Sequence, residues 1–142
     1  MSKATPQDRA TALIEARGAQ ATPTRIRVLT MLLAADTALS HHTLMAQSLT
    51  AGRAIDKVTL YRVLDWLVAQ QLAHSVTGQD RVRRFSAAHA HHQGHAHFEC
   101  DSCGRLYCLA EAATPPAMPA GFETRCVELT VHGQCADCRA SA

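Results

Sequence analysis

The pairs Cys100-Asp-Ser-Cys103 and Cys135-Ala-Asp-Cys138 decide the fold of the C-terminal half of this 142-residue chain, and 31 residues lie between them. A two-residue gap lets both sulfurs of a short turn reach one ion, and zinc takes four thiolates in a tetrahedron at about 2.3 Å. The spacing therefore predicts one structural Zn²⁺ held by all four cysteines. Two disulfides or a redox-active pair are the alternatives for a chain with six cysteines.

The N-terminal segment, Met1-Ser-Lys-Ala-Thr-Pro-Gln-Asp-Arg9, is polar and lacks the apolar stretch of an export signal. No apolar run in the sequence approaches the ~20 residues that a membrane-spanning helix needs. We therefore expect a cytoplasmic protein with no membrane partner. Disulfides need an oxidising compartment, so this expectation favours zinc at the cysteine pairs.

Charge is divided unevenly along the chain. Residues 1–90 contain eleven Lys and Arg against six Asp and Glu, whereas residues 91–142 contain three against six. A basic half predicts a polyanionic partner. Five histidines crowd into residues 89–97, and such a tract is typical of a solvated linker or of metal binding.

Helix-capping residues recur through the first half of the sequence. A Ser, Thr or Asp before an apolar stripe of helical period predicts the start of a helix. Four helices are predicted, which begin after Thr5, Thr22, Ser40 and Asp56 and end near Gly18, Ala35, Gly52 and Gln70. Two β-prone stretches, 72–77 and 81–86, flank the turn Gly78-Gln79-Asp80, which is a hairpin signal. Helices followed by a hairpin predict a winged helix.

The second half of the chain is β-prone, with strands predicted at 98–100, 106–109 and 125–131 and a short helix around 109–113. The predicted fold class is therefore α+β. A winged helix-turn-helix domain is expected over residues 1–86, a hinge over 87–94, and a small C-terminal α/β domain with the four-cysteine zinc site over 95–142.

The helix predicted from Asp56 to Gln70 is placed to enter the major groove of DNA. In a winged helix the second helix of the turn reads base edges, while flanking cations hold the phosphates. The candidate DNA contacts are Lys57, Thr59, Tyr61 and Arg62 on this helix and Arg81, Arg83 and Arg84 on the hairpin. Trp66 is expected to point away from the core, and His41 and His42 to be surface residues without a partner. A merely solvated basic face is the alternative.

Four segments also carry a family resemblance: Thr22-Pro-Thr-Arg25, Val58-Thr-Leu-Tyr-Arg-Val-Leu64, His95-Ala-His-Phe-Glu-Cys-Asp-Ser-Cys-Gly104 and Gly133-Gln-Cys-Ala-Asp-Cys138. Together they resemble the ferric uptake regulator family of bacterial metal-dependent repressors. The resemblance implies a homodimer joined through its C-terminal halves. Each N-terminal half would read half of a palindromic double-stranded operator, with Arg25 as a further DNA contact. It implies neither enzymatic activity nor a small-molecule substrate.

The resemblance further implies an exchangeable, regulatory metal site that joins the two halves of the chain. The positions of its ligands are filled here by His74, His89, His95 and His97, and Cys108 stands where relatives often place a carboxylate. Imidazoles with an optional thiolate suit Zn²⁺, whereas Fe²⁺ and Mn²⁺ sensors usually include harder carboxylates. Zinc is therefore the expected regulatory metal, and an iron- or peroxide-responsive regulator is the alternative within the family.

The sequence departs from the family at Gly94 and Ala96, which in many relatives are histidines of a further metal site. That site is expected to be absent here or rebuilt from His91, His92 or Cys126. His132 is expected to be a turn residue beside the second cysteine pair.

Two readings from other functional classes remain open in the sequence. His97-Phe-Glu99 followed by Cys135-x-x-Cys138 resembles the His-x-Glu and Cys-x-x-Cys elements of zinc deaminases. Against this reading, Gln134 replaces the usual proline, and the first cysteine pair would have no role. A zinc-stapled interaction module is the other alternative; it would keep its zinc and ignore DNA.

Overall fold

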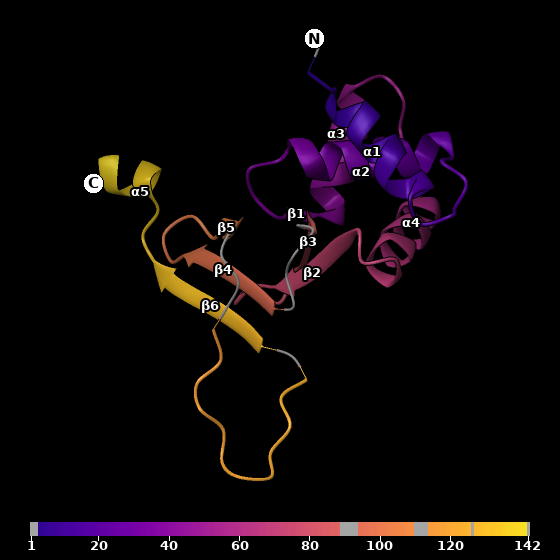
Figure 1. Ribbon diagram of the computed structural model, residues 1–142. Coiled ribbons are helices and arrows are strands. Elements are labelled where there is room, and N and C mark those ends of the chain that lie inside the picture. Colours follow the sequence, from indigo (N-terminus) through magenta and orange to yellow (C-terminus); the bar gives the residue numbers. More distant parts are fainter. Residues whose placement is uncertain (1–2, 89–93, 110–113, 126, 142) are drawn as a thin grey trace. The chain divides into compact units, whose positions relative to one another are not determined.

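The computed structural model describes residues 3–88, 94–109, 114–125 and 127–141. It divides into two compact units, Met1–Ala88 and His89–Ala142, which are described separately (Figure 1). The division falls inside the segment 87–94 that the sequence analysis assigned to a hinge. The hinge and the exact domain limits stay predictions. Together, the helices and sheets confirm the α+β class.

Four helices form most of the N-terminal unit, and each begins where a capping residue predicted it. They are α1 (Pro6–Glu15), α2 (Pro23–Ala34), α3 (His41–Thr50) and α4 (Lys57–Ala69). In each case the side-chain oxygen of the preceding residue accepts a hydrogen bond from a backbone N–H in the first turn; these residues are Thr5, Thr22, Ser40 and Asp56. Such bonds satisfy donors that have no partner within the helix.

The core of the N-terminal unit is aliphatic. The inward face of α4 contributes Leu60, Leu64 and Leu67, all fully buried, as the apolar period predicted. They pack with Leu29 of α2 and Phe85 in one cluster. Full burial of such a side chain is worth about 1.5–3 kcal/mol, so this cluster fixes how α4 is held.

A small antiparallel sheet closes the N-terminal unit. Its strands are β1 (Leu39–Ser40), β2 (Ala73–Thr77) and β3 (Arg83–Ala87), in the order β1-β3-β2. The predicted hairpin is confirmed, but its second strand begins at residue 83 rather than 81 because Arg81 has a φ of 63°, outside the β region. The strand β1 was not predicted, since two residues are too few to show an alternating pattern and the strand is defined by its pairing with β3.

The C-terminal unit contains a second three-stranded sheet and one short helix (Figure 1). The strands are β4 (Gly94–Cys100), β5 (Leu106–Cys108) and β6 (Val127–Gly133), in the order β5-β4-β6. β4 pairs antiparallel with β5 and parallel with β6. β4 is longer than predicted, because the end of the histidine tract belongs to the strand.

The helix α5 (Ala136–Ala140) follows β6 and was not predicted. Its five residues are too few to show a helical period. The short helix predicted around 109–113 is wrong at Leu109, whose backbone N–H bonds to Ala96 O and continues the pairing with β4; residues 110–113 lie outside the described residues. Among the helices described, none combines the length and the apolar character needed to cross a membrane.

Candidate metal centre and nucleic-acid interface

Parallel pairing of β4 with β6 brings the two cysteine pairs to one edge of the C-terminal sheet. Cys100 is the last residue of β4 and stands opposite Gly133, the last residue of β6. The backbone N–H of Asp101 bonds to Gly133 O at 2.7 Å, so the strands stay paired up to the point where both turn away. Two segments more than 30 residues apart in sequence therefore enter the same small volume.

The first cysteine pair occupies a tight turn between β4 and β5. The N–H of Gly104 bonds to Cys100 O at 2.9 Å, and Gly104 has a φ of 73°. That left-handed conformation is strained for any residue with a Cβ, which explains a glycine directly after Cys103.

The second cysteine pair spans the start of α5. Cys135 is the N-cap residue, and the N–H of Arg139 bonds to its carbonyl at 3.0 Å. Cys138 therefore lies in the first helical turn. The short helix, which the sequence analysis missed, thus returns the second sulfur of the pair toward the first.

The geometry of the sulfurs matches a tetrahedral zinc site. The Sγ atoms of Cys100, Cys103, Cys135 and Cys138 all lie within 4.8 Å of one another. The Sγ atoms of Cys103 and Cys135 are 3.8 Å apart, and four sulfurs at about 2.3 Å from a tetrahedral centre would be about 3.8 Å apart. A disulfide would bring two sulfurs to about 2.05 Å, and all four cysteines are free.

The thiols of this cluster differ in acidity. The backbone N–H of Cys135 donates to Cys100 Sγ at 3.3 Å, and this bond, with one from Cys103, lowers the pKa of Cys100 to about 6. The neighbouring Cys135 sulfur raises the pKa of Cys138 to about 12. Four thiolates so close together need a cation to offset their mutual repulsion, and a divalent metal supplies that charge. The donor set therefore fits zinc.

Side chains outside the cluster also join the two cysteine pairs. Arg105 and Asp137 form an exposed ion pair of 3.2 Å, and Gln134 Nε2 donates to Ser102 Oγ at 3.2 Å. Exposed ion pairs are worth little. We infer that these contacts orient the two turns and that the metal supplies most of the holding energy.

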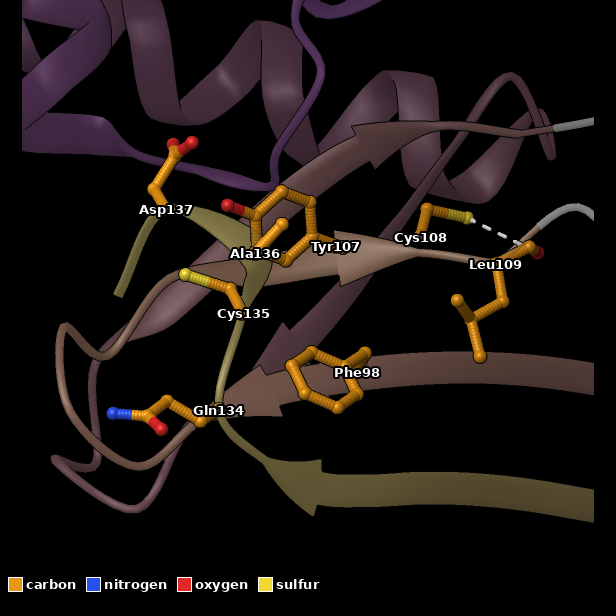
Figure 2. Close-up of a pocket in the computed structure, with 8 residues that line it drawn as sticks. All are labelled: Phe98, Tyr107, Cys108, Leu109, Gln134, Cys135, Ala136 and Asp137. Carbon is orange, nitrogen blue, oxygen red and sulfur yellow. Dashed lines mark hydrogen bonds between the residues drawn. The ribbon is translucent and has the colours of Figure 1, made fainter. Parts of the chain in front are cut away.

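Aromatic rings lie beside the cysteine cluster. Phe98 and Tyr107 are opposite each other on β4 and β5, and with Cys135 they line a hollow of ≈ 570 Å³ (Figure 2). A Cβ at Gly133 would lie 3.3 Å from the Phe98 ring. The glycine thus lets this ring lie against the end of β6, close to the second cysteine pair.

The structure describes some of the predicted regulatory ligands but not all of them. His97 and Cys108 are opposite each other on β4 and β5, with a ligand nitrogen and Sγ within 4.8 Å. His97 is buried, and burial raises the pKa of the Cys108 thiol. His74 is a buried residue of β2 in the N-terminal unit. The side chain of His95, and His89 altogether, lie outside what the structure describes, as do the substitute ligands His91, His92 and Cys126.

His132 lies in β6 rather than in a turn, which corrects the expectation for it. Its Nδ1 is 3.8 Å from Glu99 Oε2 and 3.9 Å from Asp101 Oδ1. The imidazole therefore faces carboxylates at the end of β4.

The outward face of α4 is basic and accessible. Lys57 and Arg62 are exposed, and within the described part of the chain no ion pair or hydrogen bond engages either side chain. The Tyr61 ring packs against His41 of α3, with ring centroids 4.8 Å apart. This contact corrects the expectation that His41 has no partner.

Thr59 has a structural task in addition to its predicted role. Its hydroxyl donates to Asp56 Oδ2 at 2.6 Å while its backbone N–H donates to Asp56 Oδ1 at 2.9 Å. These bonds lower the pKa of Asp56 and fix the start of α4. The hydroxyl proton is thus already used within the protein.

The other predicted DNA contacts are mostly engaged within the unit. Arg84 binds Asp80 at 2.6 Å, and Arg83 binds Asp65 at 3.2 Å. The Arg25 guanidinium lies 3.8 Å from the centre of the Trp66 ring. Trp66 also packs partly buried against the core, contrary to the expectation that it points away. Only Arg81 of the hairpin arginines has a side chain with no such partner among the described residues.

These features define a class of protein: a winged helix whose outward helix face is basic, joined in one chain to a small α/β unit with a cluster of four cysteines that fits a metal ion. The sequence profile of the Ferric uptake regulator family matches residues 16–115. The chain belongs to this family, as the motifs predicted.

The chain is similar to named and structurally characterised uptake regulators. The zinc uptake regulation protein of Escherichia coli K12 is 29% identical, with 97% of this chain and 85% of that protein covered. The structure of a zinc uptake regulator complexed with zinc and DNA matches with a TM-score of 0.71 at 25% identity, over 98% of each chain. The Vibrio cholerae ferric uptake regulator matches with a TM-score of 0.62 at 18% identity, over 88% of this chain and 98% of that one.

Proposed function

We propose that this protein is a zinc-responsive transcriptional repressor that binds palindromic operator DNA as a homodimer. The observation that carries the proposal is the likeness, over nearly the whole chain, to a zinc uptake regulator solved with zinc and DNA. Both parts needed for that function are present: a basic helix face and a four-thiolate centre. A role as an enzyme has no such support, since the family consists of regulators.

Cys100, Cys103, Cys135 and Cys138 are proposed to hold one structural Zn²⁺. The 3.8 Å separation between the Cys103 and Cys135 sulfurs supports this assignment. When bound, the metal supplies the positive charge that lets all four sulfurs be thiolates. The cysteines fix the turn after β4 to the start of α5, and so stabilise the whole C-terminal sheet.

The C-terminal unit is proposed to be the dimerisation domain. β6 is an edge strand, and Leu129 and Val131 on it are exposed. Aliphatic side chains on an open edge strand are a hazard unless a partner covers them. A second copy of the chain is the partner that this family provides.

The regulatory site is proposed to consist of His74, His89, His95 and His97, with Cys108 as a further ligand. Support comes from the facing pair His97 and Cys108, because a buried imidazole beside a thiol suits zinc better than iron or manganese. Ligands drawn from both units would make DNA binding depend on the metal. To raise a binding-competent form from 1% to 99% requires about 5.5 kcal/mol of differential affinity.

DNA is proposed to contact the outward face of α4 and the hairpin. Lys57, Tyr61 and Arg62 would reach base edges, whereas Arg81 would hold a phosphate. Arg25, Arg83 and Arg84 would contact phosphates only by sharing or leaving their present partners, so their contributions should be smaller. Thr59 would serve chiefly to fix the start of the helix.

The test is operator binding measured by fluorescence anisotropy at buffered free metal. An operator is first selected from random duplexes with the zinc-loaded protein. Zinc, iron(II), manganese(II) and nickel(II) are then titrated against the parent, His97→Ala and the control His132→Ala, whose histidine lies in β6 and is not a proposed ligand.

We expect zinc to switch on binding at the lowest free concentration, and His97→Ala to shift the zinc midpoint while His132→Ala leaves it unchanged. Binding that ignores every metal would contradict the switch. Activation by iron(II) at lower free concentration than zinc would instead assign the protein to an iron-responsive branch of the same family.

A further inference from the structure

Val58 is an exposed aliphatic residue at the start of the reading helix. Its side chain is 60% exposed, although it is the second residue of α4. The core does not explain it, because the inward face is formed by Leu60, Val63 and Leu64. Helix propensity does not explain it either, since a β-branched residue is a poorer helix former than most.

The position of Val58 on the helix is informative. Residues three and four apart lie on the same helical face, so Val58 shares its face with Tyr61 and Arg62. Lys57 stands beside it, exposed. An apolar side chain therefore shares the exposed start of α4 with two cations and with a tyrosine whose ring packs against His41.

This combination suits one kind of surface. A hydrophobic protein partner would be disfavoured by Lys57 and Arg62, whose charges it would have to desolvate. The major groove of DNA offers acceptor atoms on its base edges for the cations, and one apolar group on the same edges, the 5-methyl of thymine. The first turn of a reading helix is the part that reaches those edges.

We propose that Val58 reads the 5-methyl group of a thymine in each operator half-site and is a specificity-determining residue. The inference rests on the proposed DNA-binding function. It adds an apolar contact to the polar contacts expected from Tyr61 and Arg62.

The test removes the apolar group either from the DNA, by replacing thymine, or from the protein, by truncating Val58. Each thymine of the selected operator is replaced in turn, symmetrically in both half-sites, by deoxyuridine, which lacks only the 5-methyl. Affinities of the zinc-loaded parent and of Val58→Ala are measured by anisotropy. For the parent we expect about fourfold weaker binding per half-site at one thymine position, the factor that corresponds to about 0.8 kcal/mol for one buried apolar carbon.

In Val58→Ala the penalty at that position should disappear, while penalties at other thymines persist. Val58→Thr keeps a γ-methyl and should retain most of the penalty. Leu49→Ala truncates a comparably exposed side chain on α3, 67% exposed, and should keep the parental pattern. Thermal melting checks that all variants are folded, which is expected because neither side chain is in the core.

The outcomes separate the two proposals. If the parent selects no operator from random duplexes, the DNA-binding function fails and this inference fails with it. If an operator is bound but the deoxyuridine penalties are the same for the parent and Val58→Ala, the DNA-binding function stands and the thymine contact is wrong.

Discussion

The two units of this protein are held together in different ways. In the N-terminal unit, sixteen buried residues form one apolar cluster. In the described part of the C-terminal unit, the buried hydrophobic residues are Ala96, Leu106 and the proposed ligands Cys100 and Cys135. β6 is exposed along most of its length. The first unit therefore has a core of its own, whereas we infer that the second is stabilised by a metal and by a partner.

This difference is also a division of tasks. A reading helix must keep its shape whether or not the regulatory metal is present, and a self-sufficient aliphatic core provides that. A unit whose stability depends on bound zinc and on a second copy can couple assembly to ligand supply. The following predictions test how far this separation holds.

The largest effect is expected on loss of a structural zinc ligand. Cys103→Ser should lose the zinc and unfold the C-terminal unit, because metal affinity in such sites is largely folding free energy, about 10–16 kcal/mol in zinc-finger peptides. Zinc content by mass spectrometry and amide NMR spectra measure the two losses. The signals of residues 3–88 should stay dispersed.

Cys108→Ser is the matched control, since Cys108 lies in the same sheet but outside the four-thiolate cluster. It should retain the structural zinc and the dimer. A zinc-free Cys103→Ser protein that remains a folded dimer would contradict the dependence on metal, and simultaneous unfolding of both units would contradict the separation.

A core truncation in the other unit should have the reverse effect. Leu64→Ala leaves a cavity in the N-terminal cluster, to which Leu29 and Phe85 also belong, and should cost about 2–5 kcal/mol of unfolding free energy. Urea unfolding, followed by Trp66 fluorescence, measures the loss. The zinc content should not change. Val58→Ala, which truncates an exposed residue of the same helix, should leave the urea midpoint unchanged.

Loss of Arg62 should weaken DNA binding without affecting either unit. Arg62→Ala removes an exposed cation with no partner among the described residues, and should cost about 1–3 kcal/mol of specific binding. Arg81→Ala should weaken all sequences alike and reduce the slope of log affinity against log salt by about one. Anisotropy at several salt concentrations distinguishes them. If Arg62→Ala bound the operator with the affinity of the parent, the assignment of α4 to the DNA interface would be wrong.

The sequence was sufficient to predict most of the N-terminal unit. Its helices can be predicted from capping residues and an apolar period, both of which are local signals. Ser40 and Asp56, for example, mark the starts of their helices correctly. The strand β1 carried no such signal, because two residues are too few for an alternating pattern and only the pairing with Phe85 and Arg84 defines the strand. The contact between His41 and Tyr61 joins two helices and could not be read from either.

The residues of the candidate metal centre could be predicted from the sequence, but the strand pairing that brings them together could not. The spacing of the cysteines identified the four residues whose sulfurs the structure brings together, since two short loops are enough to present pairs of sulfurs. Their meeting depends on the parallel pairing of β4 with β6, a long-range contact without a local pattern. Val58 was overlooked because an apolar residue in a helix suggests burial, and only the structure shows that its side chain is exposed.

The smallest effect is expected in the hairpin at low pH. Arg84 donates two hydrogen bonds to Asp80 and lowers the pKa of that carboxyl to about 2, from an ordinary value near 3.8. Since the folded pKa is below the unfolded one, the stabilisation is present above about pH 4 and is lost as the pH falls toward 2. The carboxyl carbon of Asp80, followed by NMR, should titrate near pH 2 in the parent and closer to 3.8 in Arg84→Gln. Arg83→Gln is the control, because Arg83 pairs with Asp65 instead and its loss should leave the Asp80 midpoint in place. An Asp80 midpoint that does not move in Arg84→Gln would show that the ion pair does not hold this turn in solution.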